Sequence, residues 1–171
     1  MWGSGRRPWQ RSWRQRWRER PQVAARGFAV GGSPGFVDDP EMLDLILGDP
    51  ARLEEWSRDF GVTLDDSPST VGRLDEALDG VAARERRRPG TVAPRTSTWG
   101  TDIGLILGTV LVRNLPDARW FVPPDGHPVV RLGSGRYVDV VDAGRRRVAT
   151  GLPRLVDVYE EARNPRLPST G

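Results

Sequence analysis

The chain has 171 residues and a mass of 19.0 kDa, and its 26 basic and 23 acidic side chains give a net charge of +3. It contains no Cys, no Lys and a single His. This composition excludes disulfides, thiolate metal sites, lysine Schiff bases and zinc motifs built from two His. The length predicts one folded domain, and we expect no cofactor and no bound metal.

The basic character lies in an arm at residues 1–21, which holds seven Arg and one Glu, a net +6. Trp9, Trp13 and Trp17 are four residues apart and would form one stripe of a basic amphipathic helix. Arginine neutralises phosphates, and Trp stacks on bases or lies at a lipid interface, so the arm is a candidate for binding nucleic acid or an anionic membrane surface. The alternatives are a disordered tail or an upstream extension from a misread start codon. The candidate residues are Trp9, Arg11, Trp13, Arg14, Arg16, Trp17 and Arg18.

A glycine-rich linker follows the arm and predicts the domain boundary. We expect residues 1–36 to be arm and linker, residues 37–163 to be one domain, and residues 164–171 to be a disordered tail. The apolar stretch after the arm is interrupted by Arg26 and Gly27, which is untypical of an export signal. The expected location is the cytoplasm.

Three helices are predicted in the first half of the domain. Apolar spacing, with Pro at the helix starts and Gly at the ends, indicates a short helix at residues 40–47 and a second one that starts at Asp49–Pro50 and ends at Gly61. A third helix is predicted to start at Pro68 and to end in the run Arg84–Arg88, where cations suit the carbonyl end of the helix dipole. Residues 89–98 show no period and predict a loop.

The most hydrophobic segment, residues 103–112, predicts a buried central helix. Thr101 and Asp102 are its expected N-terminal caps, and it is half as long as a membrane span requires. Gly104 and Gly108 share one face, where they favour close packing of another backbone over membrane dimerisation or ligand binding.

The second half of the domain changes to a period of two. The predicted strands of an antiparallel meander are Arg119–Val122, Val129–Leu132, Arg136–Val141 and Arg146–Thr150. A final helix is expected from Pro153 to Asn164. These elements predict an α+β fold, in which N-terminal helices and a buried central helix pack on a small antiparallel β-meander that a C-terminal helix closes.

No pattern for catalysis emerges. His127 lies in a turn composition, and Ser134 lies in a Gly-Ser-Gly hairpin loop rather than a nucleophile elbow. Adjacent carboxylates such as Glu54–Glu55 do not face each other on a helix, which makes them poor acid–base pairs. We therefore assign no catalytic, cofactor-binding or metal-binding residue.

A second candidate binding patch comes from the predicted strands. If Leu132 pairs with Arg136 across the hairpin loop, Arg131 lies opposite Tyr137 and diagonal to Asp139. A cross-strand ion pair is the preferred interpretation, and an anion- or partner-binding patch is the alternative; a register shift of one residue would separate the pair. The candidate residues are Arg131, Arg136, Asp139, Arg145 and Arg146.

Three blocks of sequence carry a resemblance to a known family. They are Leu64–Pro68 with Leu74–Asp75, then Trp99–Gly104 continuing to Gly108–Val110, then Trp120 with Pro128–Leu132 and Asp139–Val141. Over residues 40–160 the chain resembles an uncharacterised domain family of actinobacterial proteins. This resemblance implies a family and no mechanism, and it does not extend to the arm.

The preferred interpretation of function is a domain that binds another protein and catalyses nothing, because a well-patterned core stands beside no catalytic constellation. The alternative is a protein that the arm anchors to nucleic acid or to an anionic membrane. An enzyme is the least favoured of the three.

Overall fold

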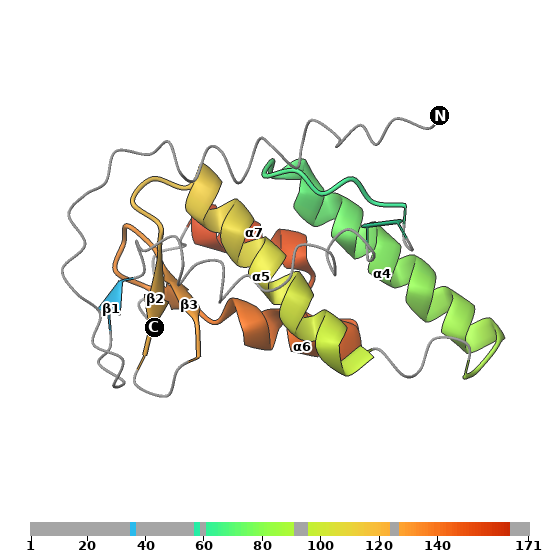
Figure 1. Ribbon diagram of the computed structural model, residues 1–171. Coiled ribbons are helices and arrows are strands. Elements are labelled where there is room, and N and C mark those ends of the chain that lie inside the picture. Colours follow the sequence, from blue (N-terminus) through green and yellow to red (C-terminus); the bar gives the residue numbers. More distant parts are fainter. Residues whose placement is uncertain (1–34, 37–56, 59–60, 91–95, 124–126, 165–171) are drawn as a thin grey trace, which may run out of the picture.

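The computed structural model describes residues 35–36, 57–58, 61–90, 96–123 and 127–164 (Figure 1). Its helices in this part of the chain are α4 (Ser69–Arg87), α5 (Thr96–Asn114), α6 (Val140–Thr150) and α7 (Leu155–Arg163). Its strands are β1 (Gly35–Phe36), β2 (Arg119–Val122), β3 (Val129–Arg131) and β4 (Tyr137–Val138). The strands form one antiparallel sheet in the order β1-β2-β3-β4. The α+β prediction is therefore confirmed.

Several predictions fall outside these residues. The arm, the helix at 40–47, most of the second helix and most of the tail are not among the described residues. One described strand, β1, lies in the segment that the sequence assigned to the linker, and it forms the edge of the sheet beside β2.

The central helix is confirmed as the core of the fold. In Figure 1, α5 runs between the sheet on one side and α4 on the other. From Ile103 to Val112 every side chain is buried except Thr109, which is half-buried. A helix that is apolar around its whole circumference can be stable only when other elements cover it on all sides. The sheet, α4, α6 and α7 all contact it.

Gly100 and Gly104 of α5 and Gly144 of α6 allow the two helices to approach very closely. A Cβ added to Gly104 would lie 2.3 Å from the carbonyl oxygen of Val140, and one added to Gly144 would lie 2.2 Å from the carbonyl oxygen of Gly100. On the same side of α5, Gly108 lies against the indole of Trp120. The predicted close approach of another backbone is confirmed at Gly104, whereas Gly108 makes room for the buried ring of Trp120.

A buried ion pair joins α4 to the C-terminal helices. Asp75 of α4 is fully buried and accepts a hydrogen bond of 2.7 Å from Nε of Arg147 in α6. Its two carboxylate oxygens also accept the backbone N–H groups of Leu155 and Val156, at 3.1 and 3.0 Å. Asp75 therefore caps the start of α7, whose N-terminal N–H groups have no partner within the helix.

The guanidinium of Arg147 is enclosed by acceptors. Besides Asp75 it donates to Asp79 at 2.5 Å and to the carbonyl oxygen of Gly151 at 2.6 Å. Burial lowers the pKa of Arg147, but hydrogen bonds and charges from Asp79 and Asp75 outweigh burial and raise this pKa above its ordinary value. The cluster is satisfied internally and connects three helices.

One predicted strand is shorter than expected, and another is wrong. Within the strand predicted at Arg136–Val141, only Tyr137 and Val138 form a strand, and α6 begins at Val140. The segment Arg146–Thr150, also predicted as a strand, is the second half of α6. Asp139 causes the switch, because its carboxylate accepts the N–H of Asp142 at 2.8 Å and so caps a helix. Gly144, which lies between the two segments predicted as strands, is inside α6 where α5 crosses it.

The loop predicted at residues 89–98 is also partly wrong. α5 begins at Thr96, so Thr101 and Asp102 lie inside the helix and do not cap it. The third predicted helix is confirmed as α4, and the last one as α7, with Pro153 two residues before its first residue.

Candidate functional site

The sheet has one face toward the helices and one face away from them. Trp120 and Val130 are fully buried against the helices. Because side chains alternate along a strand, their neighbours on β2 and β3 point to the opposite face. This outer face contains Phe36, Arg119, Phe121, Val129, Arg131 and Tyr137.

Three aromatic rings form a continuous surface across the outer face. The ring centroids of Phe36 and Phe121 are 5.5 Å apart in an edge-to-face arrangement, and those of Phe121 and Tyr137 are 5.2 Å apart. Phe36 is 41% exposed and Tyr137 is 50% exposed. Rings at these separations stabilise one another, but here they also leave much apolar surface in contact with water.

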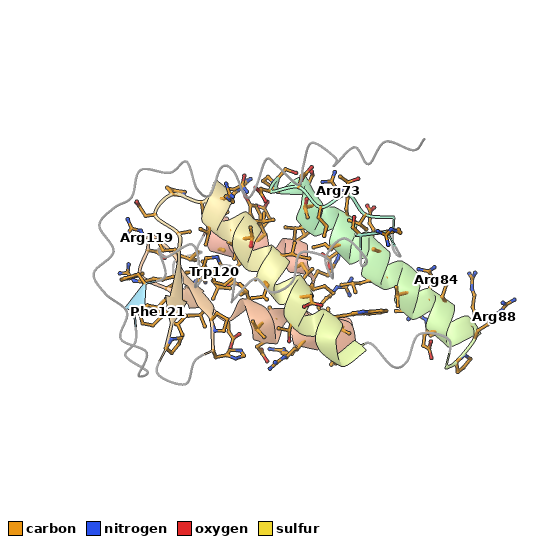
Figure 2. The ribbon with its side chains drawn as sticks, viewed as in Figure 1. Arg73, Arg84, Arg88, Arg119, Trp120 and Phe121 are labelled. Atoms are coloured by element: carbon orange, nitrogen blue, oxygen red, sulfur yellow. The ribbon has the colours of Figure 1, made fainter. Side chains whose placement is uncertain are left out.

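Two arginines lie beside these rings. Arg119 and Arg131 are directly opposite each other on β2 and β3. The guanidinium carbon of Arg131 is 5.5 Å from the ring centre of Phe36, a cation–π contact. Figure 2 labels Arg119 and Phe121 on β2, one on each side of the buried Trp120 along the chain. The outer face therefore combines exposed aromatic surface with positive charge.

The single histidine lies close to the start of α6. Nε2 of His127 is 3.5 Å from Oδ1 of Asp139, and both side chains are partly exposed. Asp139 already accepts the Asp142 N–H as the cap of α6. Ser134 lies in the turn between β3 and β4, where Gly135 has a φ of 87° and its N–H donates to the carbonyl oxygen of Leu132. A turn is thus the observed role of this Gly-Ser-Gly sequence.

The predicted register between β3 and β4 is confirmed, since Arg131 lies opposite Tyr137 and the N–H of Leu132 donates to the carbonyl oxygen of Arg136. The five candidate patch residues nevertheless interact with different elements. Arg131 contacts Phe36, and Asp139 caps α6. The other three contact Glu161, Thr101 and Asp142: Arg136 pairs with Glu161 at 2.7 Å, Arg145 donates to Thr101 at 3.3 Å, and Arg146 lies 3.8 Å from Asp142.

The start of α4 is held by the Asp65 carboxylate. Asp65 accepts hydrogen bonds from the N–H of Ser67 at 3.0 Å and from the hydroxyl of Thr70 at 2.6 Å, and it pairs with Arg73 at 2.9 Å. Burial raises the pKa of Asp65, but the hydrogen bonds from Ser67, Thr70 and Arg73 outweigh burial and hold this pKa well below its ordinary range. The Asp65 carboxylate thus holds the turn before α4, and its three protein partners leave few of its lone pairs for a ligand.

This shift predicts an acid-sensitive turn. A carboxyl whose pKa is lower in the folded than in the unfolded chain stabilises the fold above its unfolded value of 3.8, and the contribution is lost as the pH falls further toward the folded pKa. We expect Asp65→Asn to lower the free energy of unfolding at pH 6 by about 1 kcal/mol, a small value because the side chain is half-exposed and screened by water. Urea unfolding from pH 6 to pH 2.5 measures it: the variant should lose less stability than the wild type, whereas Glu76→Gln, exposed on the same helix, should follow the wild type.

Neither a metal centre nor a membrane span is found in the described residues. In that part of the chain no group of three or more His, Asp or Glu side chains is placed to hold a metal ion. None of the described helices combines the length and the apolar character that crossing a membrane requires.

A family model matches residues 8–165, and its description is a family of unknown function, DUF6278. The chain belongs to this family. The family model covers more of the chain than the resemblance at residues 40–160, because it also includes the Trp and Arg positions of the arm from Trp9 onward. No match was found among the curated proteins or the solved structures.

The aromatic surface is not among the features predicted from the sequence. The alternation of side chains along β2 was a usable signal. Once the strand is recognised, Arg119 and Phe121 must point to the other face of the sheet from Trp120. The placement of Phe36 had no such signal, since it pairs with Phe121 from a distant part of the chain.

Proposed function

We propose that this protein is a binding module without catalytic activity, and that the outer face of its sheet docks a protein partner. The observation that carries the proposal is the aromatic surface of exposed Phe36 and Tyr137 with half-buried Phe121 between them, beside Arg119 and Arg131. Aromatic residues and Arg are enriched at the centres of protein interfaces, where they supply most of the binding free energy. A partner that fits this face presents apolar side chains next to carboxylates.

Site-specific cross-linking tests this proposal. A photoreactive phenylalanine analogue at position 137 keeps an aromatic ring on the outer face, and the same analogue at position 76 on α4 is the matched control. In cells that naturally make the protein, we expect a discrete cross-linked product from position 137 and none from position 76. Adding Arg119→Ala should reduce the yield at least about tenfold, the effect of a central interface residue.

The product also identifies the class of partner. A product whose mass is unchanged by nuclease and that yields peptides of a second protein supports a protein partner, whereas loss of the attached mass on nuclease treatment would indicate a nucleic acid instead. Equal products from positions 137 and 76, or none from either, would contradict a docking role for this face.

A second function is proposed for the arm: attachment to nucleic acid or to an anionic membrane surface. Two observations favour it, namely the net +6 charge of residues 1–21 with three regularly spaced Trp, and the extent of the family match, which includes residues 8–21. Such attachment weakens steeply with salt. Replacing the seven arm arginines with Gln tests it in the titrations described below.

A further inference from the structure

α4 continues beyond the hydrophobic core. Its last buried side chain is Val81, but the helix runs on to Arg87. In this extension Ala82, Arg84, Arg86 and Arg87 are exposed, and the remaining two residues are half-buried. Figure 1 places this end of α4 away from the sheet, and Figure 2 shows Arg84 and Arg88 there. Core packing therefore does not account for these residues.

Three arginines of this extension have no acidic partner among the residues that the structure describes. We call Arg84, Arg86 and Arg87 the arginine tip. The acid in the same segment, Glu85, accepts the N–H of Gly90. In the described part of the chain, the guanidinium groups of Arg84, Arg86 and Arg87 make no ion pair or hydrogen bond. By contrast, five other arginines within the described ranges have acidic partners: Arg73 with Asp65, Arg113 with Asp66, Arg136 with Glu161, Arg146 with Asp142 and Arg163 with Glu160.

Helix stability alone is a weak explanation for this cluster. Cations near the carbonyl end of a helix interact favourably with its dipole. Like charges three residues apart, such as Arg84 and Arg87, repel each other by a comparable amount. Several arginines in one helical turn therefore bring little net gain in helix stability, whereas a negatively charged ligand would remove the repulsion between them.

We propose that the arginine tip binds the backbone phosphates of nucleic acid. The planar guanidinium presents two parallel N–H groups that fit phosphate oxygens. A lipid surface fits less well, because membrane-bound helices need an apolar face, and no large hydrophobic side chain is exposed at residues 82–90. The proposal is independent of protein docking on the sheet and adds a phosphate contact on the folded domain to that proposed for the arm.

The test is a salt titration with full-length protein and a labelled 20-base-pair DNA duplex, followed by fluorescence anisotropy between roughly 50 and 200 mM salt. Each phosphate contact adds about 0.9 to the slope of log affinity against log salt. We expect R84Q/R86Q/R87Q to make this slope shallower by about 2 to 3 and to weaken binding at least about tenfold at the lowest salt. The matched control is R136Q/R146Q/R163Q, which removes the same charge from paired arginines and should change the slope by less than about 1. Circular dichroism checks that both variants are folded.

The same titrations are repeated in a chain whose seven arm arginines are Gln. If the tip binds phosphates, this chain still binds DNA and still loses the additional slope with R84Q/R86Q/R87Q, whatever the arm contributes. The arm proposal fails if these seven substitutions leave the slope for DNA and the binding of phosphatidylserine vesicles unchanged. The tip proposal fails if its variant matches the control, if the arm-neutral chain does not bind DNA, or if the tip alters binding to the vesicles but not to DNA.

Discussion

Replacing Asp75 with Ala should destabilise the protein by about 3–5 kcal/mol, enough to lower the melting temperature by roughly 10 °C or more. The substitution leaves the buried guanidinium of Arg147 with one carboxylate partner instead of two, and the N–H groups of Leu155 and Val156 without an acceptor. Loss of one partner from a buried ion pair and its hydrogen-bond network is among the most costly changes in a folded protein. Chemical denaturation monitored by circular dichroism measures the change.

Asp79 provides the matched control for this prediction. It also pairs with Arg147, but its side chain is 59% exposed, so water can replace its oxygens when it is removed. We expect Asp79→Ala to cost about 1 kcal/mol. Equal losses for the two variants would mean that the Asp75 cluster does not hold α4 to α7.

Gly144→Ala should destabilise the fold by about 3 kcal/mol, at the upper end of overpacking costs. The added Cβ would lie 2.2 Å from the carbonyl oxygen of Gly100 and 2.5 Å from the amide nitrogen of Gly104. Both atoms are backbone, so α5 and α6 must separate. Thermal unfolding of the variant measures the effect.

The control for this prediction is Gly80→Ala on α4, and the expected effect has the opposite sign. No atom lies within 4 Å of the added Cβ, and Ala favours a helix over Gly by about 0.5–1 kcal/mol. Stabilisation by Gly80→Ala together with strong destabilisation by Gly144→Ala would show that close contact, rather than helix propensity, decides the outcome at the helix crossing. A Gly144→Ala variant as stable as the wild type would contradict the observed approach of the two helices.

The proposed binding surfaces lie in different parts of the molecule. The aromatic outer face belongs to the sheet, and the arginine tip is at the end of α4 away from it (Figure 1). Both are unnecessary to the core: α5 is covered by the opposite face of the sheet and by the helices. Variants on these surfaces should therefore separate binding from folding, whereas Asp75 and Gly144 affect folding itself.

The sequence by itself determined the elements whose signals are local. The apolar run at Ile103–Val112 had to be buried, the spacing from Val71 to Val81 had to form one helical face, and the Gly-Ser-Gly loop set the register that places Arg131 opposite Tyr137. Membership of an uncharacterised family also followed from residues in order along the chain.

Tertiary structure decided what depends on distant partners. Val140–Thr150 is rich in β-branched residues and Arg and resembles a strand locally, but the Asp139 cap, the burial of Arg147 against Asp75 and the passage of α5 over Gly144 make it a helix. Phe36 completes the aromatic surface only because β1 pairs with β2. Short-range propensities amount to fractions of a kcal/mol per residue, whereas burial and charge pairing amount to several, so long-range contacts prevail where the two conflict.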